Sequence, residues 1–465
     1  MNRAFSMILT VAALLLAACG SNSTQLSGIQ GSGFAYGPIT GFGSIFVNGV
    51  EYTTTNAQIR IDDQTGAETE LHVGDIVTVN GTVNTDAKTG TATQVTFSGD
   101  VAGAVATIDS AGGTFIVLGQ TIRVTGSTLF DDNIHPASIA GLQVGTLVEV
   151  SGFPNAAGEI VASRIQLESP GKDLEAKGVV QALDTTAHAF HVNTLVVDYS
   201  AITPNGTLAN GSMVKVKGTG FAATGALLAT SVQVLQGFGG SAAAPAEVEG
   251  IITSFTSNAD FVLNGQHVTT SGNTTFTLNG VTLGINVHVE VEGSFDSSGA
   301  LVATSVVAKP DSSSVVRGLV DSIGAASNTM SVLRVTITTS ATTEFEDDSS
   351  QKLRPFRLSD LRTGDYVEVR GAAGQTGGLE AKVLMRETPD TVSSLQGVAS
   401  SVNFPTLIVL GITVTTTSQT QYTGADGTVL TAGTFFTQAP NKTVKVVSTV
   451  TNGAFIATQA QIESQ

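Results

Sequence analysis

Alternating apolar and polar residues, interrupted by two-residue turns, recur along almost the whole chain. Segments such as residues 46–52, 262–268 and 408–414 place β-branched or aromatic residues at every second position on both sides of a central turn. A period of two is typical of strands that bury one face, and Asn48-Gly49 and Asn264-Gly265 supply residues that adopt the positive φ angles of tight hairpin turns. The pattern therefore predicts β-hairpins.

Six such hairpins follow one another at a regular spacing. Their central turns begin every 69 to 77 residues, at Asn48, Leu118, Asn193, Asn264, Leu333 and Leu410. An alternating segment follows each hairpin, and in the clearest copies, such as residues 73–81 and 363–371, glycines bound it. The sixth copy, residues 443–448, lacks both glycines. Self-similarity at a fixed period indicates tandem repeats.

Each repeat is expected to contain five strands. A glycine-marked strand such as residues 103–108 opens the repeat, the hairpin and the alternating segment follow, and a strand such as residues 228–232 closes it. A short helical turn, for example residues 358–361, precedes the fourth strand. Five strands with a helical turn between the third and fourth are typical of an OB-like barrel. We predict an all-β protein, a tandem array of about six small five-stranded OB-like barrels, with SH3-like barrels as the alternative.

The spacing also predicts the domain boundaries. The six repeats are expected at residues 37–99, 100–169, 172–236, 247–310, 312–388 and 393–465. The Gly/Ala/Pro-rich residues 237–246 are expected to form a linker between repeats 3 and 4. Six barrels in a row would extend on the order of 170 Å, so we expect an elongated particle that bends at this linker. A single outer-membrane barrel is disfavoured, because aromatic residues are only 6% of the chain and such barrels need aromatic girdles.

The N-terminus has the features of an export signal. Arg3 precedes an apolar run at residues 7–18, which has the length of a signal-peptide core and is too short to span a membrane, so residues 1–18 are predicted to be a signal peptide. The following Cys19 ends a string that resembles a bacterial lipobox. It is also the only cysteine. We therefore predict lipid attachment at Cys19 and a lipidated flexible tether over residues 19–36.

The predicted anchor determines the expected location. Ser21 is not the aspartate that resemblance to bacterial lipoproteins associates with retention in the inner membrane, so an outer-membrane lipid-anchored protein is expected, facing the periplasm or the cell surface. The membrane, through the acyl chain on Cys19, is the predicted partner, with envelope proteins and neutral glycans as further candidates. Nucleic acid is disfavoured, because 38 Asp and Glu against 21 Lys and Arg give a net charge of −17.

Three pairs of aspartates occupy corresponding places between the hairpin and the fourth strand. They are Asp62 and Asp63, Asp131 and Asp132, and Asp347 and Asp348. Calcium binds several carboxylate and carbonyl oxygens on a flexible loop, so these pairs are candidate metal ligands. Aspartate also favours turns for its own hydrogen bonding, and no loop has the spacing of an EF-hand. A solvated turn is the main interpretation, and Ca²⁺ is the only cofactor candidate.

No catalytic motif is present in the sequence. The six histidines are spread over four repeats, and a nucleophile elbow, a phosphate loop and paired cysteines are absent. We predict that the protein is not an enzyme and has a binding or structural spacer role. Two alternatives stay open. One is an envelope hydrolase or other enzyme with a site between barrels, and the other is a calcium- or glycan-binding adhesin that uses rim aromatics such as Phe153 and Phe221.

One family resembles this chain. Residues 37–50, followed by the glycine-bounded strand, resemble the repeat domain of proteobacterial lipoproteins catalogued as domain of unknown function 5666. The resemblance extends over residues 37–464 and is strongest in the first two repeats. It implies a small β-barrel on an exported protein, with no established activity or ligand.

Overall fold

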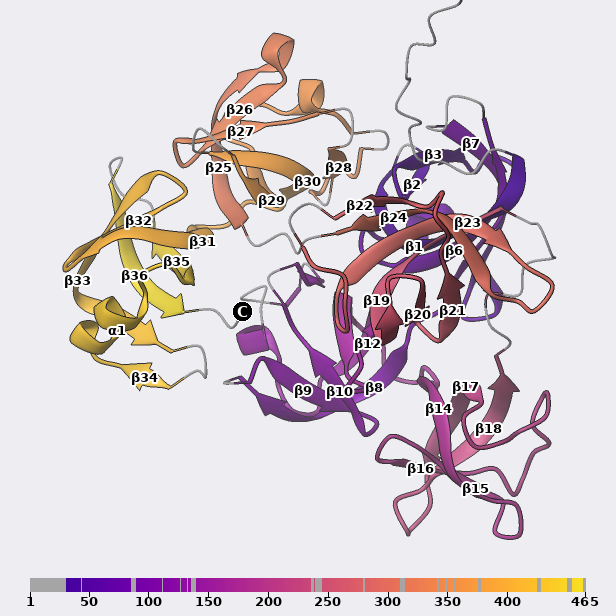
Figure 1. Cartoon of the computed structure of the whole chain (residues 1–465). Coiled ribbons are helices and arrows are strands. Elements are labelled where there is room, and N and C mark those ends of the chain that lie inside the picture. Colours follow the sequence, from indigo (N-terminus) through magenta and orange to yellow (C-terminus); the bar gives the residue numbers. More distant parts are fainter. Residues whose placement is uncertain are drawn as a thin grey trace, which may run out of the picture.

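Each repeat folds as a small β-barrel (Figure 1). The computed structural model describes residues 31–42, 44–84, 89–110, 112–125, 127–131, 133–134, 139–235, 238, 245–278, 281–309, 314–340, 343–347, 349–353, 356–374, 378–424, 428–449 and 454–462. Residues 1–30 lie outside this part, and with them Cys19 and the predicted signal peptide. In the described residues, no helix is long and apolar enough to cross a membrane.

Five main strands build each repeat. In the first half of the chain they are β1 (Gly31–Gly41), β2 (Ile45–Val47), β3 (Val50–Thr53), β6 (Ile76–Val83) and β7 (Thr89–Phe97) in repeat 1, β8 (Val101–Asp109), β9 (Thr114–Val117), β10 (Gln120–Arg123), β12 (Leu147–Pro154) and β13 (Ile160–Leu167) in repeat 2, and β14 (Leu174–Asp184), β15 (Ala189–Val192), β16 (Leu195–Asp198), β17 (Met213–Phe221) and β18 (Leu227–Val234) in repeat 3.

The second half of the chain repeats this series. Its strands are β19 (Pro245–Ser257), β20 (Asp260–Leu263), β21 (Gln266–Thr269), β23 (His288–Phe295) and β24 (Leu301–Ala308) in repeat 4, β25 (Ser314–Gly324), β26 (Thr329–Val332), β27 (Val335–Thr338), β29 (Tyr366–Ala373) and β30 (Leu379–Glu387) in repeat 5, and β31 (Val392–Asn403), β32 (Thr406–Val409), β33 (Ile412–Thr423), β35 (Thr443–Thr449) and β36 (Phe455–Ile462) in repeat 6.

Shorter elements lie mostly between the third and fourth main strands. The short strands are β4 (Gln58–Ile61), β5 (Gln64–Thr65), β11 (Leu129–Phe130), β22 (Thr275–Thr277), β28 (Glu344–Asp347) and β34 (Val429–Leu430). The helical turns are η1 (Glu68–Glu70), η2 (Ile139–Gly141), η3 (Ala325–Ser327), η4 (Leu358–Asp360) and α1 (Ala432–Gln438). All of these turns except η3 stand where an OB-like barrel has its helix, which agrees with the sequence pattern.

Strand pairing closes every repeat in the same way. The first strand pairs antiparallel with the second and the fourth, the third runs parallel to the fifth, and the fifth pairs antiparallel with the fourth, as β1, β2, β3, β6 and β7 illustrate. The order 1-2-3-5-4 therefore returns to strand 1, which is the closed order of an OB-like barrel. The alternating pattern places side chains such as Val77 and Val79 in the core. The predicted fold class is confirmed.

A bulge inside the fourth strand interrupts its pairing with the fifth. The register shifts there in all six repeats, and the residue is glycine in five of them, for example Gly293, where an added Cβ would collide with the Val302 carbonyl oxygen. Glycine is favoured at such a bulge because the two backbones approach closely. In repeat 6, Ser448 stands at the same shift, and its buried hydroxyl donates a hydrogen bond to the Ile456 carbonyl at 2.7 Å.

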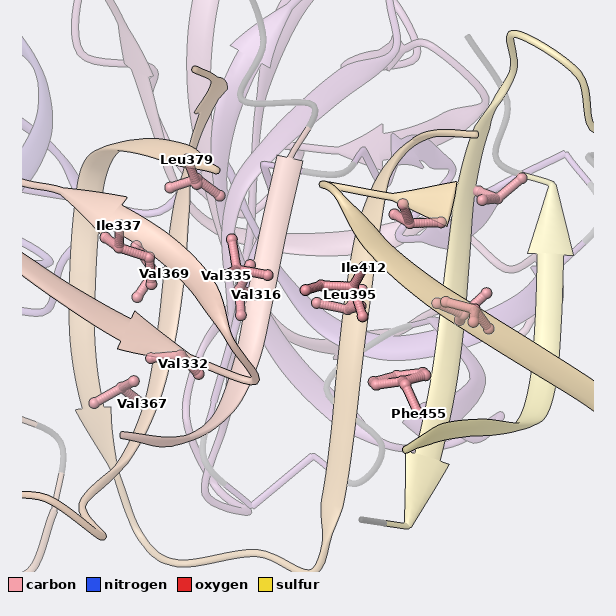
Figure 2. Close-up of a cluster of buried hydrophobic side chains, with 14 of the residues drawn as sticks. Val316, Val332, Val335, Ile337, Val367, Val369, Leu379, Leu395, Ile412 and Phe455 are labelled. Atoms are coloured by element: carbon pink, nitrogen blue, oxygen red, sulfur yellow. The ribbon is translucent and has the colours of Figure 1, made fainter. Parts of the chain in front are cut away.

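The barrels are joined in pairs through their first strands. Strand β8 pairs antiparallel with β14, β25 pairs antiparallel with β31, and β1 pairs parallel with β19. Three continuous sheets result, each extending through two barrels: repeats 2 and 3, repeats 5 and 6, and repeats 1 and 4. Figure 2 shows the repeat 5 and repeat 6 cores beside one another, with Val316 of β25 next to Leu395 of β31.

The expected elongated row of barrels is wrong. Repeat 1 pairs with repeat 4, which is not its neighbour in sequence, and it also contacts repeats 2, 3 and 5. Arg164 of repeat 2 donates to the Val73 carbonyl at 3.0 Å, Lys217 of repeat 3 donates to the Asp62 carbonyl at 3.0 Å, and Met385 of repeat 5 packs into the repeat 1 core. The physical reason is that the edge of β1 bonds to β19, which folds the second half of the chain back onto the first.

Two predicted boundaries also change. Strand β1 begins at Gly31, so residues 31–36 belong to repeat 1 and are not part of a tether over residues 19–36. Strand β19 begins at Pro245, inside the predicted linker 237–246, and most of the remaining linker lies outside the described residues. Phe238 packs on repeat 1, with its ring centroid 4.5 Å from that of Tyr36. In both cases pairing with the fourth strand of the same repeat extends the first strand, because Gly31 lies opposite Val83 and Pro245 lies opposite Ser294.

Candidate functional sites at the barrel junctions

Charged side chains gather where barrels meet. Along β17, Val214 and Val216 point into the core of the repeat pair, so Lys215 and Lys217 lie on the opposite face. In an isolated barrel this face would be in water. In this protein repeat 1 packs against this face and places Asp63 beside both lysines, so the polar half of the alternating pattern becomes buried as well.

The first site is a lysine–carboxylate cluster at the junction of repeats 1, 2 and 3. We define it as Asp62, Asp63, Ser98, Asp100, Glu149, Glu175, Lys177, Lys215 and Lys217. Lys215, 6% exposed, lies 2.9 Å from an Asp63 carboxylate oxygen and 3.2 Å from Glu175, and its ammonium group donates to Ser98 Oγ at 2.7 Å. These bonds join a turn of repeat 1 to the fourth strand of repeat 3.

Two further lysines complete this lysine–carboxylate cluster. Lys217 lies 3.2 Å from Asp63 and 3.4 Å from Glu175. Lys177 of β14 lies 3.5 Å from Asp100, which precedes β8 of repeat 2 and accepts a hydrogen bond from the Gly152 backbone N–H at 2.9 Å. Each lysine therefore has a carboxylate partner, and the three repeats are connected through charge pairs.

Burial shifts the pKa values of the carboxyl groups in this cluster. Desolvation, and then the charge of Glu175, raise the pKa of Asp62, although Lys215 and Lys217 oppose the shift. The pKa of Glu149 is raised well above its usual range, first by desolvation and then by Asp62 and other carboxylates. For Asp63, burial raises the pKa but the hydrogen bonds and charges of Lys215 and Lys217 outweigh it, so the pKa is lowered. The cluster thus contains protonatable and ionised carboxyl groups side by side.

The second site is a glutamate square on repeat 4, formed by Glu247 and Glu249 of β19 and Glu290 and Glu292 of β23. Glu247 lies directly opposite Glu292, and Glu249 directly opposite Glu290. Like charges in directly opposed positions destabilise a sheet. Among the described residues, a lysine and a histidine lie beside this square. Lys309 pairs with Glu290 and lies 3.7 Å from Glu249, and His288 lies 3.0 Å from Glu249.

The predicted aspartate pairs occupy turns. Asp62 and Asp63 both have positive φ and form the two-residue turn between β4 and β5. The Asp131 carboxylate accepts hydrogen bonds from the backbone and side-chain amides of Asn133, at 2.9 Å each. Asp347 accepts from Arg386, with Nε at 2.9 Å. These contacts are those of turn and ion-pair residues, and they do not bring the aspartates of different repeats together.

The calcium hypothesis gains no geometric support from these positions. Asp132 and Asp348 lie outside the described residues. Within the described part of the chain, no group of three or more His, Cys, Asp or Glu side chains lies close enough to hold a metal ion. The Arg386 side chain lowers the pKa of Asp347 to about 2, against the opposing effect of burial, so this carboxylate is ionised and already paired with a cation.

The two rim aromatics have different positions. Phe153 is buried at the junction of repeats 1, 2 and 4, where it packs against Tyr36 and His288 with ring centroids 6.3 and 5.3 Å apart, so its proposed place on an exposed glycan platform is wrong. Phe221 is 50% exposed. The reason is that repeats 1 and 4 pack against the end of β12, whereas the end of β17 stays open.

Sequence reasoning missed both junction sites. The sequence does mark these residues, because Lys215, Lys217, Glu247 and Glu290 are polar residues in alternating apolar–polar segments. In a strand that buries one face, such polar positions are expected to face solvent. Only the pairing of barrels distinguishes a polar position in water from one buried against another repeat.

Comparisons with known proteins place the chain in a family without a known activity. A model of one family, described as "Domain of unknown function (DUF5666)", matches residues 36–96, 102–166, 177–233, 249–307, 317–383 and 396–461. Among the curated proteins, none matches this chain significantly.

One solved structure is similar over part of the chain. The structure "drosophila Unr CSD456" matches at 12% identity with a TM-score of 0.15, covering 45% of this chain and 99% of that chain. A superposition of this quality carries no argument about function. The six family matches coincide with the six barrels and together cover well over half of the residues. The chain therefore belongs to the family of the domain of unknown function DUF5666, as six tandem copies.

Proposed function

We propose that this protein is a non-catalytic, lipid-anchored scaffold of the cell envelope, in which joined barrels present binding surfaces. The observation that carries the proposal is the pairing of first strands, which converts six barrels into three two-barrel sheets. Main-chain pairing across two domains fixes their relative orientation far better than a flexible linker does. A protein built in this way is suited to hold surfaces at fixed positions.

The junction contacts support the same proposal. Glu175 and Lys215, both of repeat 3, are each 6% exposed and are both hydrogen-bonded to Ser98 Oγ of repeat 1. A buried charge pair contributes specificity of association when both partners are present. These ionisable groups are accessible to a substrate only if the barrels separate. We therefore assign them to holding the barrels together.

The anchor and the partners belong to the same proposal. Cys19 would attach the scaffold to the outer membrane, and the exposed surfaces would bind envelope proteins or neutral glycans, with half-exposed Phe221 as a contact point. A net charge of −17 disfavours polyanions such as nucleic acid. Family membership indicates no catalytic class.

Small-angle scattering on the full chain in solution tests the scaffold. A compact chain of this length has a radius of gyration of roughly 22 Å, whereas a row 170 Å long has one of roughly 50 Å. We expect a value much closer to the compact one, unchanged between low and moderate salt. A value near that of the row would show that the barrels do not associate and would contradict the scaffold.

A second candidate is an enzyme that uses the lysine–carboxylate cluster. The observation that favours it is the raised pKa of Glu149 beside other carboxyl groups, since perturbed carboxyl groups are common in active sites. Turnover of ester, glycoside or phosphoester substrates that Glu149→Gln abolishes without changing the scattering curve would establish this candidate. Equal background turnover by both proteins would remove it.

A further inference from the structure

The contact between repeats 1 and 4 contains an uncompensated acidic group. Glu247 is 0% exposed, and within the described residues neither of its carboxylate oxygens has a hydrogen-bond partner among groups that donate. Its neighbours on the paired strand are Glu290 and Glu292, which are themselves acids. A buried carboxylate without donors is costly, so the group must be neutralised for the junction to form.

The described residues of repeat 1 that pair with this part of β19 include no cation. The facing strand β1 has Ala35 opposite Glu247, between Phe34 and Tyr36, and β3 of repeat 1 contributes Tyr52 near the Glu247 charge. On the repeat 4 side, Lys309 acts on Glu247 only in part, because it pairs with Glu290 and also reaches Glu249. The charged and titratable groups around the square are thus Tyr36, Tyr52, His288, Glu290, Glu292, Lys309 and, near Glu249, Lys382 of repeat 5.

The two glutamates of β19 differ in protonation. Desolvation and then the charges of Glu290 and Glu292 raise the pKa of Glu247 well above its usual range. Burial would also raise the pKa of Glu249, but Lys309 and His288 outweigh it and hold that pKa at about 2. Glu249 is therefore ionised and paired with Lys309 and His288, while burial beside other acids disfavours the ionised form of Glu247.

We propose that the junction of repeats 1 and 4 is a proton-controlled contact, closed when Glu247 is protonated and loosened when it is ionised. The geometry supports this proposal, since β1 and β19 pair over only three residues on each strand, and Glu247 of the glutamate square is the central residue of the paired segment of β19. Loosening would uncover the ring contacts among Phe34, Tyr36 and Phe238. Such a contact between repeats 1 and 4 would regulate the scaffold. It does not depend on the lipid anchor or on any binding partner.

The direction of the pH dependence follows from the raised pKa of Glu247. A carboxyl group whose pKa is higher in the closed state favours closure most at low pH, and that advantage is lost as the pH rises from about 4.5 through the raised pKa. The lowered pKa of Glu249 is due mainly to Lys309 and His288 of the same repeat, which stay beside it whether the junction is closed or open, so it stabilises repeat 4 and not the junction. The junction is therefore tightest at about pH 4.5 and below.

Hydrogen exchange on the full chain tests the proposal, with amides of residues 34–36 and 246–248 as the reporters and β14 as an internal reference. After correction for intrinsic rates, opening should increase by up to about tenfold for each pH unit above 4.5, the limit for release of one proton. Glu247→Gln, which mimics the protonated form, should flatten this rise. Glu249→Gln, two residues away on the same strand, is the matched control and should keep the rise.

Three results would overturn the proposal. One is a wild-type profile that does not change between pH 4.5 and 8, and another is a Glu247→Gln profile identical to the wild type. The third is tightening by millimolar calcium at pH 7.5, which would assign the square to a cation. If the Gln variant does not fold, Glu247→Met removes the same charge at similar length and should give the same flat profile. Barrels that stay joined at all pH values would leave the scaffold intact while refuting this inference.

Discussion

Lys215→Met should destabilise repeat 3 and its contact with repeat 1 more than any other single lysine change in the cluster. The Lys215 ammonium group is 3.2 Å from Glu175 of the same repeat, and both side chains are 6% exposed. It also lies 2.9 Å from Asp63 and donates to Ser98 Oγ, both of repeat 1. At an effective dielectric constant of about 20, unit charges 3.2 Å apart interact by roughly 5 kcal/mol. Lys217 remains 3.4 Å from Glu175, and the variant no longer desolvates an ammonium group, so both effects reduce the loss. We expect a net destabilisation of about 3 kcal/mol, the range measured when one partner of a buried pair is removed.

The assay is hydrogen exchange of β14 and β17, because a six-barrel chain does not unfold in one step and a single unfolding free energy is not defined for it. Lys217→Met is the matched control. Its Asp63 partner is 50% exposed and solvent screens that interaction, so the expected loss is about 1 kcal/mol. Removing both partners, with Lys215→Met and Glu175→Gln together, should cost less than the sum of the single changes. A change below about 0.5 kcal/mol for Lys215→Met would refute the argument that this junction depends on buried charge.

Three further predictions concern the bulge glycines, the aspartate turns and the anchor. Gly293→Ala should destabilise repeat 4 by about 1–3 kcal/mol, because the added Cβ meets the Val302 carbonyl oxygen. Gly220→Ala is the control and should be neutral, because there is open space around its Cβ. Equal melting temperatures of the two variants would contradict this reasoning. Asp347→Asn should lower the stability of repeat 5, because Arg386 loses the ionised carboxylate of Asp347. Calcium should leave the melting temperature of the wild type unchanged, since only a ligand that binds the native state raises the melting temperature. A rise with calcium that a chelator reverses would restore the metal hypothesis. Cys19→Ala should abolish incorporation of a labelled fatty acid, and label retained on the variant would exclude lipidation at this residue.

The repeat architecture could be predicted because its causes are local. Alternation places Val214 and Val216 in the core whichever barrel lies next to β17, and the turns at Asn48 and Asn264 need only their own backbone angles. The glycine at the bulge of the fourth strand is likewise determined within one repeat, since the carbonyl oxygen that an added Cβ would meet belongs to the fifth strand of the same repeat. The number of barrels, their strand order and the family resemblance were therefore all accessible from the sequence.

The arrangement of the barrels and both junction sites were decided by tertiary structure. Alternation specifies which face of a strand points to its own core, but it does not specify what covers the other face. The edge of β1 could in principle bond to the first strand of any repeat, and its pairing with β19 across two intervening repeats depends on surfaces far apart in sequence. Lys215 and Glu247 therefore have the same polar pattern as solvent-exposed residues, and only the packing of one barrel on another gives them their burial, their partners and their shifted chemistry.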